Sequence, residues 1–160
     1  MQIRTAALAD LPELVAIEAE CFPAAEAATE ASIADRLAAY PNHFWVQLDR
    51  GRIIGFVNGM VTDEPDLRDE MYENASLHNE AGAWQMIFGV DTLPAYRCRG
   101  CAAALLNHVI AEAKAQGRKG LVLTCKDRLV HCYAKFGFVN EGVSGSTHGN
   151  VMWYQMRLTF

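Results

Sequence analysis

Hydrophobic and polar positions in the first part of the chain follow two different periods, and each period predicts one kind of element. Residues 1–6 alternate between polar and apolar side chains, which predicts a short strand. Residues 11–22 and 28–39 repeat apolar side chains at helical spacing, and Asp10 stands where it would cap the first helix. Residues 43–61 hold two apolar runs joined by polar turn residues, which predicts a β-hairpin.

The rest of the chain continues this alternation with further strands and helices. Strands are expected over residues 82–90, 119–125, 138–142 and 150–158, and helices over residues 99–117 and 127–137. Gly117 would end the first of these helices and Asp127 would cap the second. The resulting order, β-α-α-β-β-β-α-β-α-β-β, predicts an α/β (α+β) chain with a mixed sheet.

Composition and charge exclude several classes of protein. A length of 160 residues favours a single domain over residues 1–160, and a net charge of −5 gives no reason to expect a nucleic-acid partner. No apolar run approaches the roughly 18 residues of a membrane span, and the first ten residues lack the pattern of a signal peptide. The five cysteines form no paired framework, so we expect reduced thiols in a cytoplasmic protein.

The hexapeptide RCRGCA, residues 97–102, carries two competing patterns. It follows a predicted strand and opens a predicted helix, so its backbone N–H groups would form an anion site at a helix N-terminus. Gly100 would allow a phosphate close to the backbone, and Arg97 and Arg99 would add positive charge. A basic strand–loop–helix junction without a ligand has the same appearance.

The same hexapeptide holds Cys98 and Cys101 at the C-x-x-C spacing of redox and zinc sites. Tetrahedral zinc needs four ligands, and the next two cysteines, Cys125 and Cys132, do not have the matching spacing. We therefore expect no metal and interpret the cysteines as small buried apolar residues. A zinc or disulfide-exchange protein stays open as a minor alternative.

Two motifs in order give the chain a family resemblance. Arg97-x-x-Gly100-x-Ala102, between a strand and a helix, resembles the acetyl-CoA motif of the GNAT N-acetyltransferase superfamily, and LTCKDRLVHCYAKFGFV resembles its next segment. The stretches CFPAAEAAT, WQMIFGVDTLPAYRCRGCAAALL and CKDRLVHCYAKFGF resemble most the serotonin (arylalkylamine) N-acetyltransferase branch with its bacterial and fungal relatives.

The resemblance implies a fold, a co-substrate and a set of site residues. The GNAT fold has a mixed, mostly antiparallel sheet of about six to seven strands, helices on both faces and a splayed strand pair that holds CoA. Acetyl-CoA would be the co-substrate, and Gly89 is a plausible point for the strand to kink. The expected coenzyme-binding residues are Phe88, Gly89, Val90, Arg97, Cys98, Arg99, Gly100, Cys101, Ala102 and Asp127.

Tyr133 matches the tyrosine that acts as general acid in the family. An ordinary phenol has a pKa of roughly 10, close to that of a CoA-type thiol, so proton transfer to the leaving sulfur would be nearly balanced. The general base is open, because Trp84 and Met86 stand where the arylalkylamine branch has two histidines. Other candidates for the base are His78, Glu80, Glu20 and His148.

Aromatic and apolar side chains suggest the walls of an acceptor site. Phe22, Trp84 and Met86 are the expected substrate-binding residues, and segment 63–80 adds seven acidic side chains against one arginine. The acidic run is either a solvated loop or a rim that attracts a cationic amine. We expect a small amine acceptor, an arylalkylamine or a polyamine, no nucleic-acid or membrane partner, and a monomer or homodimer. A peptide amine, or a GNAT-fold regulator that binds acyl-CoA without turnover, stays open.

Overall fold

Nine strands form two sheets that share one interrupted strand segment in the computed structural model, which describes all residues from 1 to 160. The first sheet has the order β1-β2-β3-β6 and is antiparallel throughout. Its strands are β1 (Gln2–Thr5), β2 (Phe44–Asp49), β3 (Arg52–Asn58) and β6 (Gly89–Thr92). The second sheet has the order β4-β5-β7-β9-β8. Its strands are β4 (Val61–Thr62), β5 (Trp84–Ile87), β7 (Gly120–Cys125), β9 (Tyr154–Thr159) and β8 (Val139–Val143).

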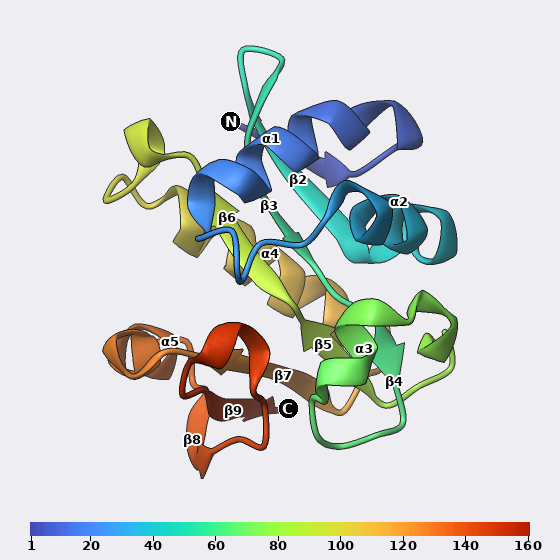
Figure 1. Cartoon of the computed structure of the whole chain (residues 1–160), viewed down its shortest axis with the longest axis vertical. Helices are drawn as coiled ribbons and strands as arrows, with labels where there is room; N and C mark the ends of the chain where they lie inside the picture. The colour runs from blue at the N-terminus through green and yellow to red at the C-terminus, as the bar shows by residue number, and fades with distance from the viewer.

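Helices cover both faces of the first sheet. Figure 1 shows α1 (Leu11–Cys21) and α2 (Glu30–Ala39) in front of the sheet and α4 (Cys101–Ala115) behind it. The two short helices, α3 (Asp69–Glu73) and α5 (Val130–Ala134), lie beside the second sheet. No helix combines the length and the apolar character that crossing a bilayer requires. The architecture confirms the predicted mixed α/β fold with helices on both faces.

Helical periodicity in the sequence decides which faces are buried. Leu14 and Ile17 of α1, and Ile33 and Leu37 of α2, are three or four residues apart and all lie in the core cluster in front of the sheet. A second cluster joins α4 to both sheets through residues such as Leu105, Leu106 and Val109. The two clusters fix α1 and α4 on opposite sides of β6, which later lines the site.

The segment from Trp84 to Thr92 changes sheets at Phe88. Its first half, β5, runs parallel to β7 and pairs as far as Ile87 opposite Leu123. Its second half, β6, pairs only with β3, so the other edge of β6 carries unpaired backbone groups. The predicted splayed strand pair is therefore present, and Gly89 is the first residue beyond the break.

Several local predictions need correction. The acidic segment 63–80, expected as a loop or rim, contains α3 and a single 3-10 turn, and β4 before it pairs with β5. Asp10 stands before α1 but does not cap it, because its carboxylate accepts hydrogen bonds from Arg4 and from the Ala7 N–H. Asp127 makes no capping hydrogen bond either. The sequence places both carboxylates near the start of a helix, but it does not show which hydrogen-bond donors each one contacts.

A buried histidine joins the acidic segment to the core. His43 is 1% exposed; its Nδ1–H donates to Gln85 Oε1 at 2.9 Å and its Nε2–H donates to the Glu80 carboxylate at 2.9 Å. The Gln85 amide is oriented because its Nε2 donates to the carbonyls of Gly59 and Met86. Both ring nitrogens of His43 thus lie within hydrogen-bond distance of a side-chain oxygen.

We expect Glu80→Ala to destabilise the fold by about 1–3 kcal/mol, because the buried His43 Nε2–H would lose its acceptor. The pKa of Glu80 is lowered by its hydrogen bonds to His43 and His78, despite an opposing effect of burial. The carboxylate therefore stabilises the protein above its unfolded pKa, and this contribution disappears as the pH falls through the lower folded value. Denaturant unfolding at neutral pH measures the loss. Glu73→Ala removes an exposed carboxylate and serves as the control; an equal loss in both variants would contradict the argument.

Candidate active site

The N-terminus of α4 is built to receive an anion. Helix α4 has 15 residues, and no side chain caps the free N–H groups of its first turn. Gly100 has a φ of +77°, a left-handed conformation, and a Cβ built there would meet no heavy atom within 4 Å. Cys98 is also left-handed, with a φ of 59°. The loop therefore exposes its backbone donors in an open cradle, which fits a pyrophosphate.

Arginine side chains surround this cradle. The Nε–H of Arg97 donates to the Thr92 carbonyl at 3.1 Å, which holds the guanidinium beside the loop. Arg99 stacks on the ring of Tyr96, with 5.0 Å from its Cζ to the ring centroid. Arg128 approaches from the segment before α5 and lines the adjacent groove. These cations add electrostatic attraction for a phosphate to the helix N-terminus.

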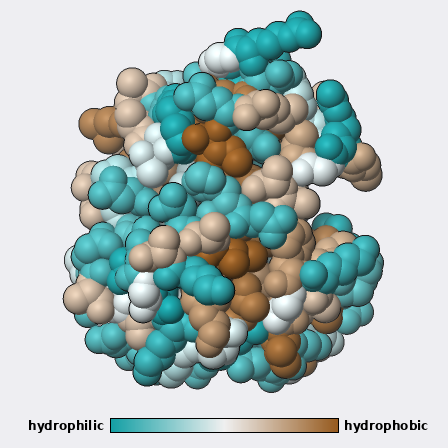
Figure 2. Space-filling view, turned by 180° about the vertical axis from the view of Figure 1, so that it is seen from behind, coloured by the Kyte–Doolittle hydropathy of each residue, from teal (hydrophilic) through white to brown (hydrophobic).

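A groove of about 360 Å³ runs from this loop between α4 and α5. It is lined by Cys21, Phe22, Val90, Thr92, Arg97, Ala102, Ala103, Leu106, Arg128, Leu129, Cys132, Tyr133 and Phe136. In Figure 2 the outline of the molecule is indented at the right, between its upper and lower halves, on the side where these helices face each other. The unpaired edge of β6 lies beside this groove, where it can pair with the amides of an extended arm.

The groove meets a second, more enclosed cavity of about 160 Å³. Both spaces share the walls Cys21, Phe22, Val90, Arg128, Leu129 and Tyr133. The inner cavity is further lined by Glu18, Pro23, Glu26, Ala28, Arg36, Tyr72, Phe88, Gly89, Thr124, Cys125, Lys126, His148 and Trp153. The splay of β6 from β7 therefore opens one passage from the α4 loop to an inner, partly aromatic chamber.

Tyr133 stands where the groove and the cavity join. Its ring packs edge-on against Phe138, with 6.1 Å between the centroids, and its hydroxyl makes no hydrogen bond within the protein. Burial raises the pKa of the Tyr133 phenol well above its ordinary value. The folded environment therefore makes this phenol a weaker acid than an ordinary tyrosine and keeps its proton in place.

A stacked pair of rings carries a free imidazole nitrogen on the opposite wall. His148 Nε2–H donates to the Glu26 carbonyl at 2.8 Å, so neutral His148 holds its lone pair at Nδ1, which has no partner in the protein. The His148 ring stacks on Tyr72 with 5.3 Å between centroids. The Tyr72 hydroxyl in turn lies 3.1 Å from Thr124 Oγ1. Sequence reasoning had named His148 only among several candidate bases and had missed Tyr72 and Thr124.

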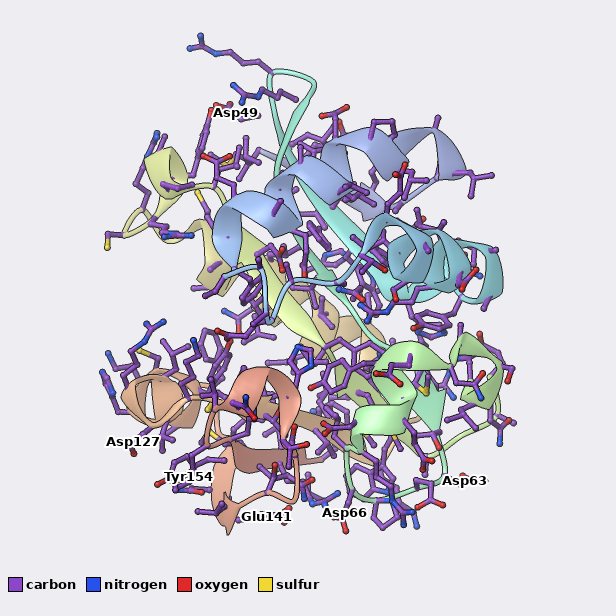
Figure 3. The ribbon with its side chains drawn as sticks, in the orientation of Figure 1. Asp49, Asp63, Asp66, Asp127, Glu141 and Tyr154 are labelled. Carbon is purple, nitrogen blue, oxygen red and sulfur yellow. The ribbon has the colours of Figure 1, made fainter.

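The predicted site residues divide into two groups in space. Tyr133, Phe22, Phe88, Gly89 and Val90 line the inner cavity, and Arg97 and Ala102 of the loop line the groove. The other predicted residues line neither space. Cys98, Arg99, Gly100 and Cys101 belong to the loop and the first turn of α4, and the remaining three lie farther away. Met86 is fully buried in the core, Trp84 stacks under the guanidinium of Arg157 at 4.6 Å, and Asp127 is exposed, on the outer side of α5 in Figure 3.

Most acids of segment 63–80 have partners within the protein, which does not favour a free anionic rim. In Figure 3 Asp66 lies close to Glu141 at the bottom of the molecule, and both accept hydrogen bonds from Arg157. Asp63 accepts from the Ala83 N–H, Glu64 and Glu70 pair with Arg68, Asp69 accepts from the Thr147 N–H, and Glu80 binds His43, His78 and Arg118. Glu73 has no such partner.

Potential metal ligands gather in one place, away from the cysteines. His43, His78 and Glu80 could present ligand atoms within 4.8 Å of one another. However, His78 Nδ1 accepts the Val61 N–H, so neutral His78 carries its proton on the Nε2 that would have to bind the metal. Arg118 also places a cationic nitrogen 2.8 Å from Glu80. We interpret the trio as an ion-pair network. All five cysteines are free, and Cys98 and Cys101 belong to no ligand group.

Comparison with known proteins identifies the family. The acetyltransferase (GNAT) family model matches residues 11–138, and the chain belongs to this family. Membership confirms the resemblance at the level of the superfamily.

Three known proteins illustrate the similarity. Serotonin N-acetyltransferase of Mesocricetus auratus is 26% identical over 110 residues, which are 68% of this chain and 52% of that protein. This chain thus spans about half the length of that relative. The GphF GNAT-like decarboxylase in complex with isobutyryl-CoA has a TM-score of 0.86 and 25% identity over 99% of both chains. The loading GNATL domain of CurA from Lyngbya majuscula has a TM-score of 0.85 and 15% identity over 99% of this chain and 96% of that one.

Proposed function

We propose that this chain transfers the acetyl group of acetyl-CoA to a small primary amine, by direct attack of the amine on the thioester. The observation that carries the proposal is the meeting of the groove and the inner cavity at Tyr133. A pyrophosphate on the α4 loop and an arm along the free edge of β6 would bring the thioester to this junction. The amine would bind in the inner cavity next to the thioester, where Phe22, Tyr72 and Trp153 supply aromatic surface.

In this mechanism the residues of the chain align, polarise and exchange protons. Alignment comes from the splayed strand, whose unpaired backbone near Val90 would face the thioester oxygen and stabilise the developing oxyanion. The amine nitrogen bonds to the carbonyl carbon, and the carbon–sulfur bond then breaks. Tyr133 donates its phenol proton to the leaving sulfur. The attacking nitrogen then gives up one of its two protons, which restores the phenol and leaves the amide product.

A panel of amines incubated with acetyl-CoA tests the proposal by release of free CoA thiol. Arylalkylamines are the favoured acceptors, because the inner cavity is partly aromatic and because a serotonin N-acetyltransferase is among the similar proteins. Polyamines and short peptides complete the panel. Thiol release that depends on an arylalkylamine supports the proposal; release only with peptides would exclude the small-amine acceptor, and release with none would exclude acetyl transfer to these classes.

Decarboxylation of a malonyl-type thioester is the second candidate. The observation that favours it is the similarity, over nearly the whole of both chains, to a protein described as a GNAT-like decarboxylase. Loss of CO₂ from a β-carboxyl group leaves an enolate on the thioester oxygen, which the same backbone donors would stabilise. Incubation with malonyl-CoA in the absence of any amine distinguishes the two functions, because only a decarboxylase then forms acetyl-CoA.

A further inference from the structure

Two carboxyl groups from different elements lie together beneath the kink of the splayed strand. Asp91 of β6 is fully buried, and neither of its oxygens accepts a hydrogen bond from a protein N–H or hydroxyl group. It lies within hydrogen-bond reach of Glu18 of α1, which is 8% exposed. A Cβ on Gly89 would lie 3.0 Å from Asp91 Oδ1, so this carboxyl sits directly under the kink.

The pair can hold only one negative charge. Burial raises the pKa of Asp91 well above its usual range, and the charge and hydrogen bond of Glu18 raise it further. Asp91 is therefore the neutral member, whose O–H donates to Glu18. The nearby cation Arg36 gives its Nη1 to Asn58 and its Nη2 to the Tyr72 carbonyl, and it forms no ion pair with either carboxyl. The Glu18 carboxylate thus keeps its charge without a cationic partner.

Glu18 presents that charge to the inner cavity. Its Oε2 accepts the Ala28 N–H at 2.8 Å, and the side chain lines the cavity next to Phe22 and Gly89. The other carboxylate on that wall, Glu26, is already paired with Lys126 at 2.9 Å. An ammonium group that leaves water for this cavity needs an anion to replace its hydration, and Glu18 is the anion left available.

Building on the proposed acetyl transfer, we infer that Glu18, held by the neutral Asp91, binds the ammonium of the acceptor and takes its proton. The proton moves from the ammonium nitrogen to a Glu18 oxygen and later to solvent, and the neutral amine then attacks the thioester as described above. Asp91 is a positioning residue in this scheme, because its O–H stabilises the ionised form of Glu18.

Substitutions that separate charge from hydrogen bonding test this inference. Glu18→Gln removes the proton acceptor but keeps an oxygen for the Ala28 N–H. We expect kcat/KM for the amine to fall by roughly 10²–10⁴-fold and the fall in rate at acidic pH to disappear, with the KM for acetyl-CoA unchanged. Asp91→Asn keeps a donor toward Glu18 and should restore most of the kcat/KM for the amine that an Asp91→Leu variant loses.

Asp91→Leu removes the donor that orients Glu18, so kcat/KM for the amine should fall while the KM for acetyl-CoA stays unchanged. His148→Gln is the comparison, because His148 Nδ1 is the other free proton acceptor of the cavity. The inference is overturned if the fall in rate at acidic pH persists in Glu18→Gln, or if it disappears in His148→Gln instead. In either case wild-type acetylation would leave the proposed function standing, whereas a wild type that acetylates no amine of the panel would remove both.

Discussion

Replacing Tyr133 by Phe should lower kcat for acetyl transfer by roughly 10²–10⁴-fold, the range that a general acid typically supplies. The ring that packs on Phe138 remains, and the lost hydroxyl has no protein partner, so stability should hardly change. The KM for acetyl-CoA should move much less than kcat, because proton donation to sulfur belongs to the transition state. Steady-state kinetics with the preferred amine, together with thermal unfolding, measures all three quantities.

The pH dependence gives this prediction a second readout. A general acid works while it is protonated, and burial raises the pKa of Tyr133. The active form therefore extends to higher pH than an ordinary phenol would allow, and the wild-type rate should not fall through pH values of about 10 on account of this group. Tyr154→Phe, which removes a hydroxyl on β9 outside the cavity, is the matched control. A Tyr133→Phe enzyme within about threefold of the wild type would show that Tyr133 only packs and that another group protonates the sulfur.

Motifs that depend on consecutive backbone could be read from the sequence. The loop at residues 97–102 is local, since Gly100 and the start of α4 are set by neighbouring residues, and the structure places its free N–H groups where spacing predicts them. The period-two and helical patterns likewise located most strands and helices, because each reports one buried face. The splay at Phe88 was expected only from the family resemblance.

Contacts between distant segments were not readable in the same way. Glu18 and Asp91 are joined only when α1 packs on β6, and His148 reaches the cavity only because the segment before β9 folds back to the Glu26 carbonyl. Trp84 and Met86 were expected to bind the substrate, but neither side chain reaches the cavity. They share a strand face with Phe88 by the period of two, but the chain changes sheets between Ile87 and Gly89, and only Phe88 reaches the cavity.

The role of the acidic segment 63–80 could not be predicted from the sequence for a related reason. Its net charge is visible in the sequence, but the partners that neutralise it, such as Arg118 and Arg157, come from strands and loops far along the chain. Composition therefore left a solvated loop and an acidic rim both open, whereas the fold pairs most of these acids within the protein. The sequence does not show that the Glu18 carboxyl lacks an ion-pair partner, because this requires knowledge of every hydrogen-bond donor around it.

Replacing Gly100 by Glu should abolish CoA binding while leaving the fold intact. The position has open space around its Cβ, so a side chain fits, and its carboxylate would stand at the cradle that receives the pyrophosphate. Two like charges about 4 Å apart near a protein surface repel by about 4 kcal/mol, which corresponds to roughly a thousandfold loss of affinity. Calorimetric titration with CoA measures the loss.

Gly100→Gln separates charge from backbone strain. The φ of +77° disfavours any side chain, so Gln and Glu variants share the same backbone cost and nearly the same volume. The Gln variant should keep CoA affinity within about tenfold of the wild type, and the gap between the two variants should narrow as salt screens the added carboxylate. Equal affinity in the wild type and in Gly100→Glu would mean that the phosphates bind elsewhere. The α4 N-terminus would then be only a helix start, and the path of the thioester to Tyr133 would need another anchor.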